Sequence, residues 1–371
     1  MADPALDALV DRVRAARAAK TPLNIQGGGT KTWYGEAPQG AALDVRALAG
    51  ISSYEPTELV VTVRAGTPLA ELEAALAEQG QCLPFEPPRF APDGSDDAKA
   101  PPSGTVGGMV AAGLAGPARA AVGGVRDYVL GAKLLNGRAE LLSFGGTVMK
   151  NVAGYDVSRL LAGAMGTLGV ICEVSLKVLP LPVASATLRF ERDEAAAIRQ
   201  LNTWGGQPLP INASAWWDGM LVLRLAGAAA AVQAASQQLR GEVIEPAQAA
   251  AFWTGLRDQS DEFFVKARAA LAGGATLWRL SVAATTPPLG LPGEQLIEWG
   301  GAQRWVVTTA PAARLREAAA QAGGHATAFR GHKADGALAP LSAPLQRIHR
   351  EMKTAFDPDR IFNPGRLYPG L

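Results

Sequence analysis

Apolar and polar residues follow two different patterns along this 371-residue chain. In the first half, short β-branched and apolar runs alternate with glycine-rich segments, and one helical period covers Pro68–Gln79 before Gly80 ends it. The apolar runs are Leu59–Val63, Tyr128–Leu130 and Val170–Val178. Because the loops rather than the helices carry the glycine, this half predicts an α+β lobe that ends at Pro180–Pro182.

After residue 182 the pattern predicts shorter, regularly alternating strands and helices. The first set has strands at Ala184–Phe190, Ser214–Trp217, Leu221–Leu225 and Val243–Ile244, and helices at Glu194–Thr203 and Ala228–Leu239. Its order, βαββαβ, is typical of a ferredoxin-like unit. The second set has strands at Thr276–Val282, Arg304–Thr308 and His325–Phe329, with helices near Gly293–Trp299 and over Ala312–Ala322. We therefore expect residues 183–335 to form a second α+β domain.

The C-terminal segment, residues 336–371, is expected to return to the first domain, residues 1–182. It begins as an amphipathic helix near Leu345 and ends in Phe356-Asp-Pro-Asp-Arg-Ile-Phe-Asn-Pro-Gly-Arg-Leu367. Two prolines and a glycine predict an ordered loop there rather than a helix. We expect this loop to clasp the first domain and to form one wall of a site.

Composition and charge restrict the classes of function. With 48% apolar and 19% charged residues, the chain is typical of a soluble protein with two lobes. Its 35 basic and 34 acidic side chains give a net charge of +1, which would not attract a nucleic acid. No segment approaches the ~20 apolar residues of a membrane span, and residues 1–20 lack the apolar core of a signal peptide. We expect a cytoplasmic protein, attached to the inner membrane at most through partners.

The two cysteines, Cys82 and Cys172, argue against a metal centre in this chain. They form no metal-ligand spacing, and an iron–sulfur cluster needs about four protein ligands. A disulfide between them is left open, but we favour two small apolar thiols in a reducing compartment.

The segment Ile25-Gln-Gly-Gly-Gly-Thr-Lys31 is a candidate anion-binding loop. Three successive glycines allow neighbouring amide N–H groups to point into one concavity, where phosphate oxygens bind. A plain turn is the alternative. A Walker loop is excluded because Thr30 stands where that loop needs glycine. A dinucleotide-binding GxGxxG fingerprint is excluded because the run leads into Thr-Trp-Tyr-Gly35 and not into a helix.

Three further glycine clusters follow, and each is joined to a β-run. In Pro101–Gly116, Ser103 and Thr105 offer hydroxyls, and Gly107-Gly108 open a short helix. Free amides at such a helix start attract anions through a partial charge of about +0.5. Tight helix packing explains the same small residues equally well. The other two clusters are Gly123–Gly131 and Gly163–Ile171.

Together these motifs resemble one known family. The order GGGTK, PSGTVGGMVAAGLAG, GGVRDYVLG, KNVAGYDVSRLLAGAMGTLGV and FDPDRIFNPGRL is similar to the vanillyl-alcohol-oxidase-type (PCMH-type) FAD-binding family, over residues 22–182 and 345–371. The fold implied is a two-subdomain FAD-binding domain followed by a ferredoxin-like domain. Within the family, the chain resembles the FAD-binding subunits of bacterial glycolate oxidases. That resemblance implies oxidation of glycolate to glyoxylate beside a larger flavoprotein subunit and an iron–sulfur subunit.

The resemblance also implies a set of residues that bind FAD. They are Gln26, Gly27, Gly28, Gly29, Thr30 and Lys31 at the pyrophosphate; Pro102, Ser103, Gly104, Thr105, Gly107, Gly108 and Gly116 along the phosphates and flavin ring; Gly124, Arg126 and Asp127 as the next wall; Gly166, Thr167, Gly169, Val170 and Ile171 at the ribityl and adenine side; and Asn363 and Arg366 over the ring. Some members bind FAD covalently through a histidine in the first glycine loop, where this chain has Thr30. The flavin is therefore expected to be non-covalent. Ala164-Met165 replaces a frequent Ser-Glu, and Gly113 a frequent Asn, which implies a less polar ring environment.

The sequence does not identify catalytic residues. Related two-domain dehydrogenases carry the motif GHxGDGNxH, and residues 331–339 match it at His332 and Asp335 but lack its asparagine and last histidine. We favour a chance match over a decayed remnant, which leaves His332 as a weak candidate for a base. Two rivals to the subunit stay open: a stand-alone FAD-linked 2-hydroxy-acid dehydrogenase, and a scaffold that has lost its flavin.

Overall fold

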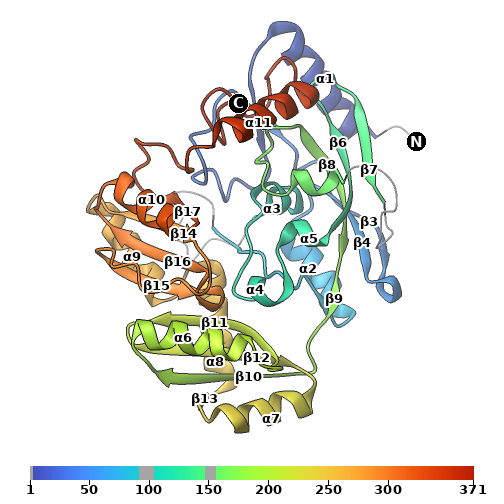
Figure 1. Cartoon of the computed structure of the whole chain (residues 1–371). Coiled ribbons are helices and arrows are strands. Elements are labelled where there is room, and N and C mark those ends of the chain that lie inside the picture. The colour runs from blue at the N-terminus through green and yellow to red at the C-terminus, as the bar shows by residue number, and fades with distance from the viewer. Residues whose placement is uncertain (1–2, 92–103, 147–155) are drawn as a thin grey trace.

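The computed structural model describes residues 3–91, 104–146 and 156–371, which form two lobes and a C-terminal tail (Figure 1). The first lobe contains a five-stranded antiparallel sheet in the order β3-β4-β8-β6-β7. These strands are β3 (Ile51–Glu55), β4 (Val60–Arg64), β6 (Val129–Leu135), β7 (Leu141–Gly145) and β8 (Val170–Lys177). Two helices, α2 (Leu69–Glu78) and α3 (Val106–Ala112), pack on this sheet, because Leu72 and Met109 share one core with Val174.

A smaller parallel pair, β1 (Leu23–Gln26) and β2 (Ala41–Asp44), packs with helix α1 (Pro4–Ala19). Leu43 of this pair shares a second core with Val170 of the main sheet. This packing fixes where the chain leaves β1 and enters the glycine loop. The remaining short elements of the lobe are η1 (Pro56–Glu58), β5 (Gln81–Cys82), α4 (Arg119–Val122), α5 (Val125–Tyr128), η2 (Ser158–Leu161) and β9 (Leu179–Pro180).

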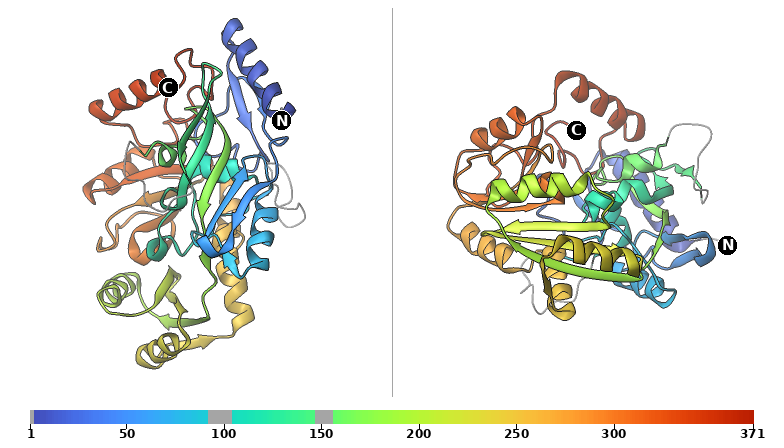
Figure 2. Two further views of the ribbon diagram at one scale, coloured as in Figure 1. Left: turned by 90° about the vertical axis from the view of Figure 1, so that its right-hand side faces the viewer. Right: turned by 60° about the horizontal axis from the view of Figure 1, so that its bottom comes forward.

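The second lobe is built on one eight-stranded antiparallel sheet in the order β13-β10-β12-β11-β15-β16-β14-β17 (Figure 2). Its first half consists of β10 (Ala184–Glu191), α6 (Glu194–Gly205), β11 (Ile211–Trp217), β12 (Met220–Gly227), α7 (Ala229–Leu239) and β13 (Glu242–Ile244). This order confirms the predicted βαββαβ unit. Both α6 and α7 cover the same face of the sheet, because Leu201 and Val232 share a core with Leu223.

The second half repeats this strand arrangement without its first helix. It consists of β14 (Thr276–Ser281), β15 (Glu294–Glu298), η3 (Trp299–Gly301), β16 (Gln303–Thr308), α10 (Ala312–Gln321) and β17 (His325–Arg330). The helix predicted near Gly293–Trp299 is therefore wrong. β15 pairs with β11 on one side and β16 on the other, and both Leu296 and Ile297 are buried. Cross-strand pairing in the middle of the sheet thus overrides the local preference of Glu, Gln and Leu for a helix.

Two helices that the sequence analysis did not predict, α8 (Pro246–Asp258) and α9 (Glu262–Ala272), connect the two halves. They cover the sheet face opposite α6 and α7, where Phe264 packs with Trp305. Phe90 of the first lobe belongs to the same core, so the lobes are joined by buried apolar contact. Within the described ranges, no helix has both the length and the apolar character needed to span a membrane.

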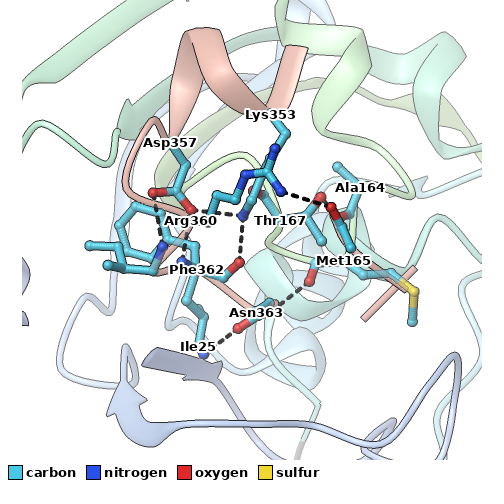
Figure 3. Close-up of polar contacts among 11 residues, drawn as sticks. Ile25, Ala164, Met165, Thr167, Lys353, Asp357, Arg360, Phe362 and Asn363 are labelled. Carbon is cyan, nitrogen blue, oxygen red and sulfur yellow. Dashed lines mark hydrogen bonds and ion pairs between the residues drawn. The ribbon is translucent and has the colours of Figure 1, made fainter. Parts of the chain in front are cut away.

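The tail returns to the first lobe as α11 (Ala343–Phe356) and the loop that follows it (Figure 3). Lys353 is 1% exposed, and its ammonium donates to the Asp357 carboxylate and to the backbone carbonyls of Thr167 and Phe362, each at 2.7 Å. The same carboxylate accepts the Phe362 amide at 2.8 Å. The buried charge is fully hydrogen-bonded, and it holds the loop after α11 against the first lobe.

Replacing Asp357 by alanine tests this cluster. The change leaves the buried ammonium of Lys353 without its counter-charge, which we expect to lower the free energy of unfolding by about 3–5 kcal/mol. Urea unfolding followed by circular dichroism measures the loss. The control is Glu351→Ala on the same helix, whose exposed partner Arg347 lies at an N···O distance of 3.6 Å. We expect little change in the control. Equal losses in the two variants would contradict the structural role of the cluster.

Candidate functional site

A cleft lies between the first lobe and the tail. Its walls come from the loop after β1, the helix α3, the loop before β8 and the loop after α11. The predicted residues that line it are Gln26, Gly27, Gly28, Gly29, Thr30, Lys31, Thr105, Gly107, Gly108, Gly166, Gly169, Ile171, Asn363 and Arg366. Segments far apart in the sequence are thus brought together around one cleft.

The glycine loop after β1 leaves backbone amides available to a ligand. The amides of Gly27 and Gly29 donate to no acceptor among the described residues. Gly29 has a φ of +70°, and a Cβ added there would meet nothing within 4 Å. A Cβ at Gly27 would instead lie 2.3 Å from Oγ1 of Thr105. The loop therefore has the open, positive-φ backbone of an anion-binding nest.

Lys31 adds a cation to the same wall. Its ammonium donates to Oγ1 of Thr30 at 3.3 Å and lies 5.8 Å from the ring centroid of Phe90. Burial lowers the pKa of Lys31 to about 8, and the charge of Asp258 opposes that shift only in part. An anion placed in the cleft would supply the missing counter-charge and favour the ammonium form.

The start of α3 differs from its prediction. The amides of Val106, Gly107 and Gly108 all donate within the protein, to the carbonyls of Thr67 and Ala65 and to Oγ1 of Thr105. A Cβ at Gly107 would lie 2.7 Å from the Cβ of Ala65. Close packing, the second of the two interpretations, therefore explains this glycine, and the free amides expected at this helix start are not there. The segment still lines the cleft.

The tail joins the other walls through two side chains. Asn363 accepts the Ile25 amide at 2.8 Å and donates to the Met165 carbonyl at 2.6 Å (Figure 3). Arg366 donates to the carbonyls of Lys31 and of the following Thr32, at 3.1 and 2.7 Å. Both side chains are buried, so their polar groups are satisfied mainly by the protein. They shape the cleft by fixing its loops.

Other predicted residues lie outside the cleft. They are Gly104, Gly116, Gly124, Arg126, Asp127, Thr167 and Val170, while Pro102 and Ser103 lie outside the described residues. Gly104 stays close, since a Cβ there would lie 3.8 Å from the ammonium of Lys31. Asp127 accepts the Gly124 amide at 2.8 Å and so caps α5, and Val170 is fully buried in a core. Capping and packing within the protein explain these positions.

The cleft also contains residues that the sequence analysis did not assign to the site. They are Asn24, Ile25, Thr32, Pro38, Val45, Ala111, Ala112 and Met165. The Met165 amide donates to the Ala111 carbonyl at 2.9 Å, which sets this apolar wall. Gly113 has a φ of +63°, and a Cβ there would lie 2.9 Å from Gly163, so the frequent asparagine does not fit this backbone. A close backbone contact thus explains Gly113, whereas Met165 lines the cleft.

His332 lies away from the cleft, in a separate cavity with Asp335. Its neighbour Lys333 reaches the first lobe instead and donates to the carbonyls of Trp33 and, at 2.9 Å, Gly35. The segment around Lys333 therefore packs against the residues that follow the glycine loop. Because His332 lines a different cavity, its position does not favour it as a base.

The cysteines and acidic groups provide no metal centre in the part of the chain that the structure describes. Cys82 and Cys172 are both free thiols, half-buried and buried respectively. No group of three or more potential ligands, counting His, Cys, Asp and Glu, comes together in these residues. Burial raises the pKa of Cys172 to about 12, which makes it an inert core residue.

Comparisons with known proteins agree with this geometry. Residues 5–145 match the FAD binding domain family. Glycolate oxidase subunit GlcD of Bacillus subtilis is 30% identical over 182 residues, 48% of this chain and 36% of that protein. A solved structure of alkyldihydroxyacetonephosphate synthase, 16% identical, covers 96% of this chain and 74% of its own with a TM-score of 0.66. That likeness concerns the fold, and it confirms the predicted α+β class.

The similarity to one relative extends along almost the whole chain. Glycolate oxidase subunit GlcE of Escherichia coli (strain K12) is 48% identical over 364 residues, which cover 98% of this chain and 97% of that protein. The FAD-binding character predicted from the glycine loops agrees with the matched domain. The chain therefore belongs to the GlcE family of glycolate oxidase subunits.

Proposed function

We propose that this chain is the FAD-binding subunit of a glycolate oxidase, which oxidises glycolate to glyoxylate within a multi-subunit complex and passes the electrons onward. The observation that carries the proposal is the full-length similarity to glycolate oxidase subunit GlcE. The cleft supports it, because its glycine loop, its cation and its apolar wall are the features that a flavin dinucleotide requires.

Two features of the cleft support FAD as its ligand. The open amides of Gly27 and Gly29 and the ammonium of Lys31 suit the diphosphate. Ala112 and Met165 offer an apolar wall to the flat ring. Thr30 has no nucleophilic imidazole, so the flavin is held without a covalent bond. When bound, FAD accepts the hydrogen and two electrons that leave the hydroxy acid.

We propose two partner subunits for this chain. The first is an iron–sulfur subunit, since the two free cysteines of this chain are too few to hold such a cluster. The partial similarity to GlcD supports a larger flavoprotein subunit as the second partner. We place the complex in the cytoplasm, at the inner membrane only through those partners.

Glycolate-dependent reduction of an artificial acceptor, with glyoxylate as the product, tests this function. We expect the complex purified with its partners to turn over and the complex without this chain to be inactive. Equal turnover without this chain would contradict the subunit proposal. Full turnover by the isolated chain would instead support the stand-alone dehydrogenase.

Gly29→Val tests the diphosphate loop. The new side chain points into the open space of the cleft, so we expect FAD affinity to fall at least about tenfold. Equilibrium dialysis of FAD measures the affinity.

Gly219→Val, in the turn between β11 and β12, is the matched control, because Gly219 has a φ of +79° and also faces open space. Both variants carry a similar backbone strain of about 1–2 kcal/mol. Equal FAD affinity in the two would contradict the loop assignment.

Lys31 should make FAD binding depend on pH. The diphosphate favours the ammonium form, so affinity should be full below pH 8 and fall as the pH rises through the pKa of about 8. Lys31→Met should weaken binding about tenfold at pH 7 and remove the pH dependence. Lys31→Arg, which keeps the charge, should retain affinity up to pH 10. Fluorescence titrations with FAD from pH 6 to 10 measure this, and the same fall with pH in Lys31→Met would contradict it.

A further inference from the structure

A second, smaller cavity lies where the first lobe meets the sheet of the second lobe. The sheet contributes Arg279 from β14, Glu298 from β15, and Gln303 and Trp305 from β16, while Gly116 belongs to the opposite wall. Arg279 lies opposite Trp305 in the register, and Glu298 lies opposite Gln303. The four side chains therefore share one face of the sheet, directed at the first lobe.

Arg279 supplies this cavity with a cation that has no carboxylate partner. Its guanidinium donates to the Tyr34 hydroxyl at 3.0 Å and lies 5.7 and 5.3 Å from the ring centroids of Tyr34 and Phe329. No acidic side chain in the described residues forms a salt bridge with it, and most of its N–H donors are unused. A half-buried guanidinium of this kind is suited to a small anionic ligand.

Glu298 supplies the same cavity with an acid–base group. The residue is 4% exposed, and one carboxylate oxygen, Oε2, accepts the Gln303 amide at 2.9 Å and the Trp305 indole at 2.6 Å. The other oxygen, Oε1, has no hydrogen-bond partner among the described residues. Burial raises the pKa of Glu298 to about 7, and the two N–H donors limit the rise. The group can therefore exchange a proton near neutral pH.

The small cavity adjoins the cofactor cleft. Ala112, at the end of α3, lines the cleft, and residues 114–116 line the small cavity. Lys31 lines the cleft, and its ammonium lies 5.8 Å from the ring of Phe90, which lines the small cavity. The two cavities are therefore neighbours, and Lys31 and Phe90 lie where they approach each other.

We propose that this cavity binds the 2-hydroxy acid, with Arg279 as the cation for its carboxylate and Oε1 of Glu298 as the acceptor of its hydroxyl proton. The inference rests on the proposed function, since it assigns the substrate to this chain. As the C2–H bond breaks, its hydrogen leaves with both electrons to the flavin, and the hydroxyl proton moves to Glu298. The C–O bond becomes a carbonyl, and no other reactant is needed. Glu298 thus has the role of general base, for which His332 is not positioned.

Titration calorimetry of the FAD-loaded chain with glycolate tests the role of Arg279. Arg279→Met should weaken glycolate affinity at least about tenfold while flavin absorbance stays unchanged. Arg314→Met, the same change at an exposed position of α10, should have no effect. Unchanged affinity in Arg279→Met, or a flavin-loaded wild-type chain that does not bind glycolate, would overturn the inference. A wild-type chain without flavin would contradict the proposed function itself, so the two failures are distinct.

Proton exchange on binding tests Glu298. A bound carboxylate raises the pKa of this acid, so glycolate binding at pH 7 should take up a fraction of a proton. Calorimetry in two buffers of different ionisation enthalpy measures that uptake. The other charged groups around the acid are Arg279, Arg257, Asp261 and Glu86.

Glu298→Gln keeps an oxygen for both N–H donors and should bind glycolate without proton uptake. It should also slow flavin reduction by glycolate about 10²- to 10⁴-fold and remove the rise of that rate as the pH increases through 7. Proton uptake equal to wild type, or an unchanged rate of reduction, would overturn the role of Glu298.

Discussion

The cleft between the first lobe and the tail depends on one buried charge, the ammonium of Lys353. This group donates hydrogen bonds to the Asp357 carboxylate and to two backbone carbonyls. These bonds offset the desolvation free energy of the buried cation and hold α11 against the first lobe. The loop that it anchors places Asn363 and Arg366 against the glycine loop and Met165. The wall that closes the cleft is thus positioned by a charge that does not itself line it.

The glycines of the first lobe meet two separate demands. Gly29 keeps a positive φ and an open backbone toward the cleft, whereas Gly107 and Gly113 allow two backbones to approach too closely for a Cβ. The sequence could predict the first role, because a run of three glycines before Thr30 is local chemistry. It could not assign the second, because the atoms that would clash with a side chain come from segments far away in the chain.

The same distinction between local and distant information explains the fold predictions. The strands and helices between 184 and 244 were predictable, because their apolar periods are local and agree with their packing. Residues 294–298 form a strand only because β11 and β16 lie on either side of them. The helices α8 and α9 carried usable local signals, namely the capping residues Glu245 and Asp261. The cavity around Glu298 was not predictable, since its residues converge only when the second lobe docks on the first.

The two lobes have different proposed roles. We propose that the cleft between the first lobe and the tail holds the dinucleotide, and that the second lobe supplies Arg279 and Glu298 to the substrate. The most direct measurement is the flavin content of the purified full-length chain. We expect the absorption spectrum of an oxidised flavin and the release of one intact FAD per chain on denaturation. A colourless protein that FAD cannot reconstitute would contradict it.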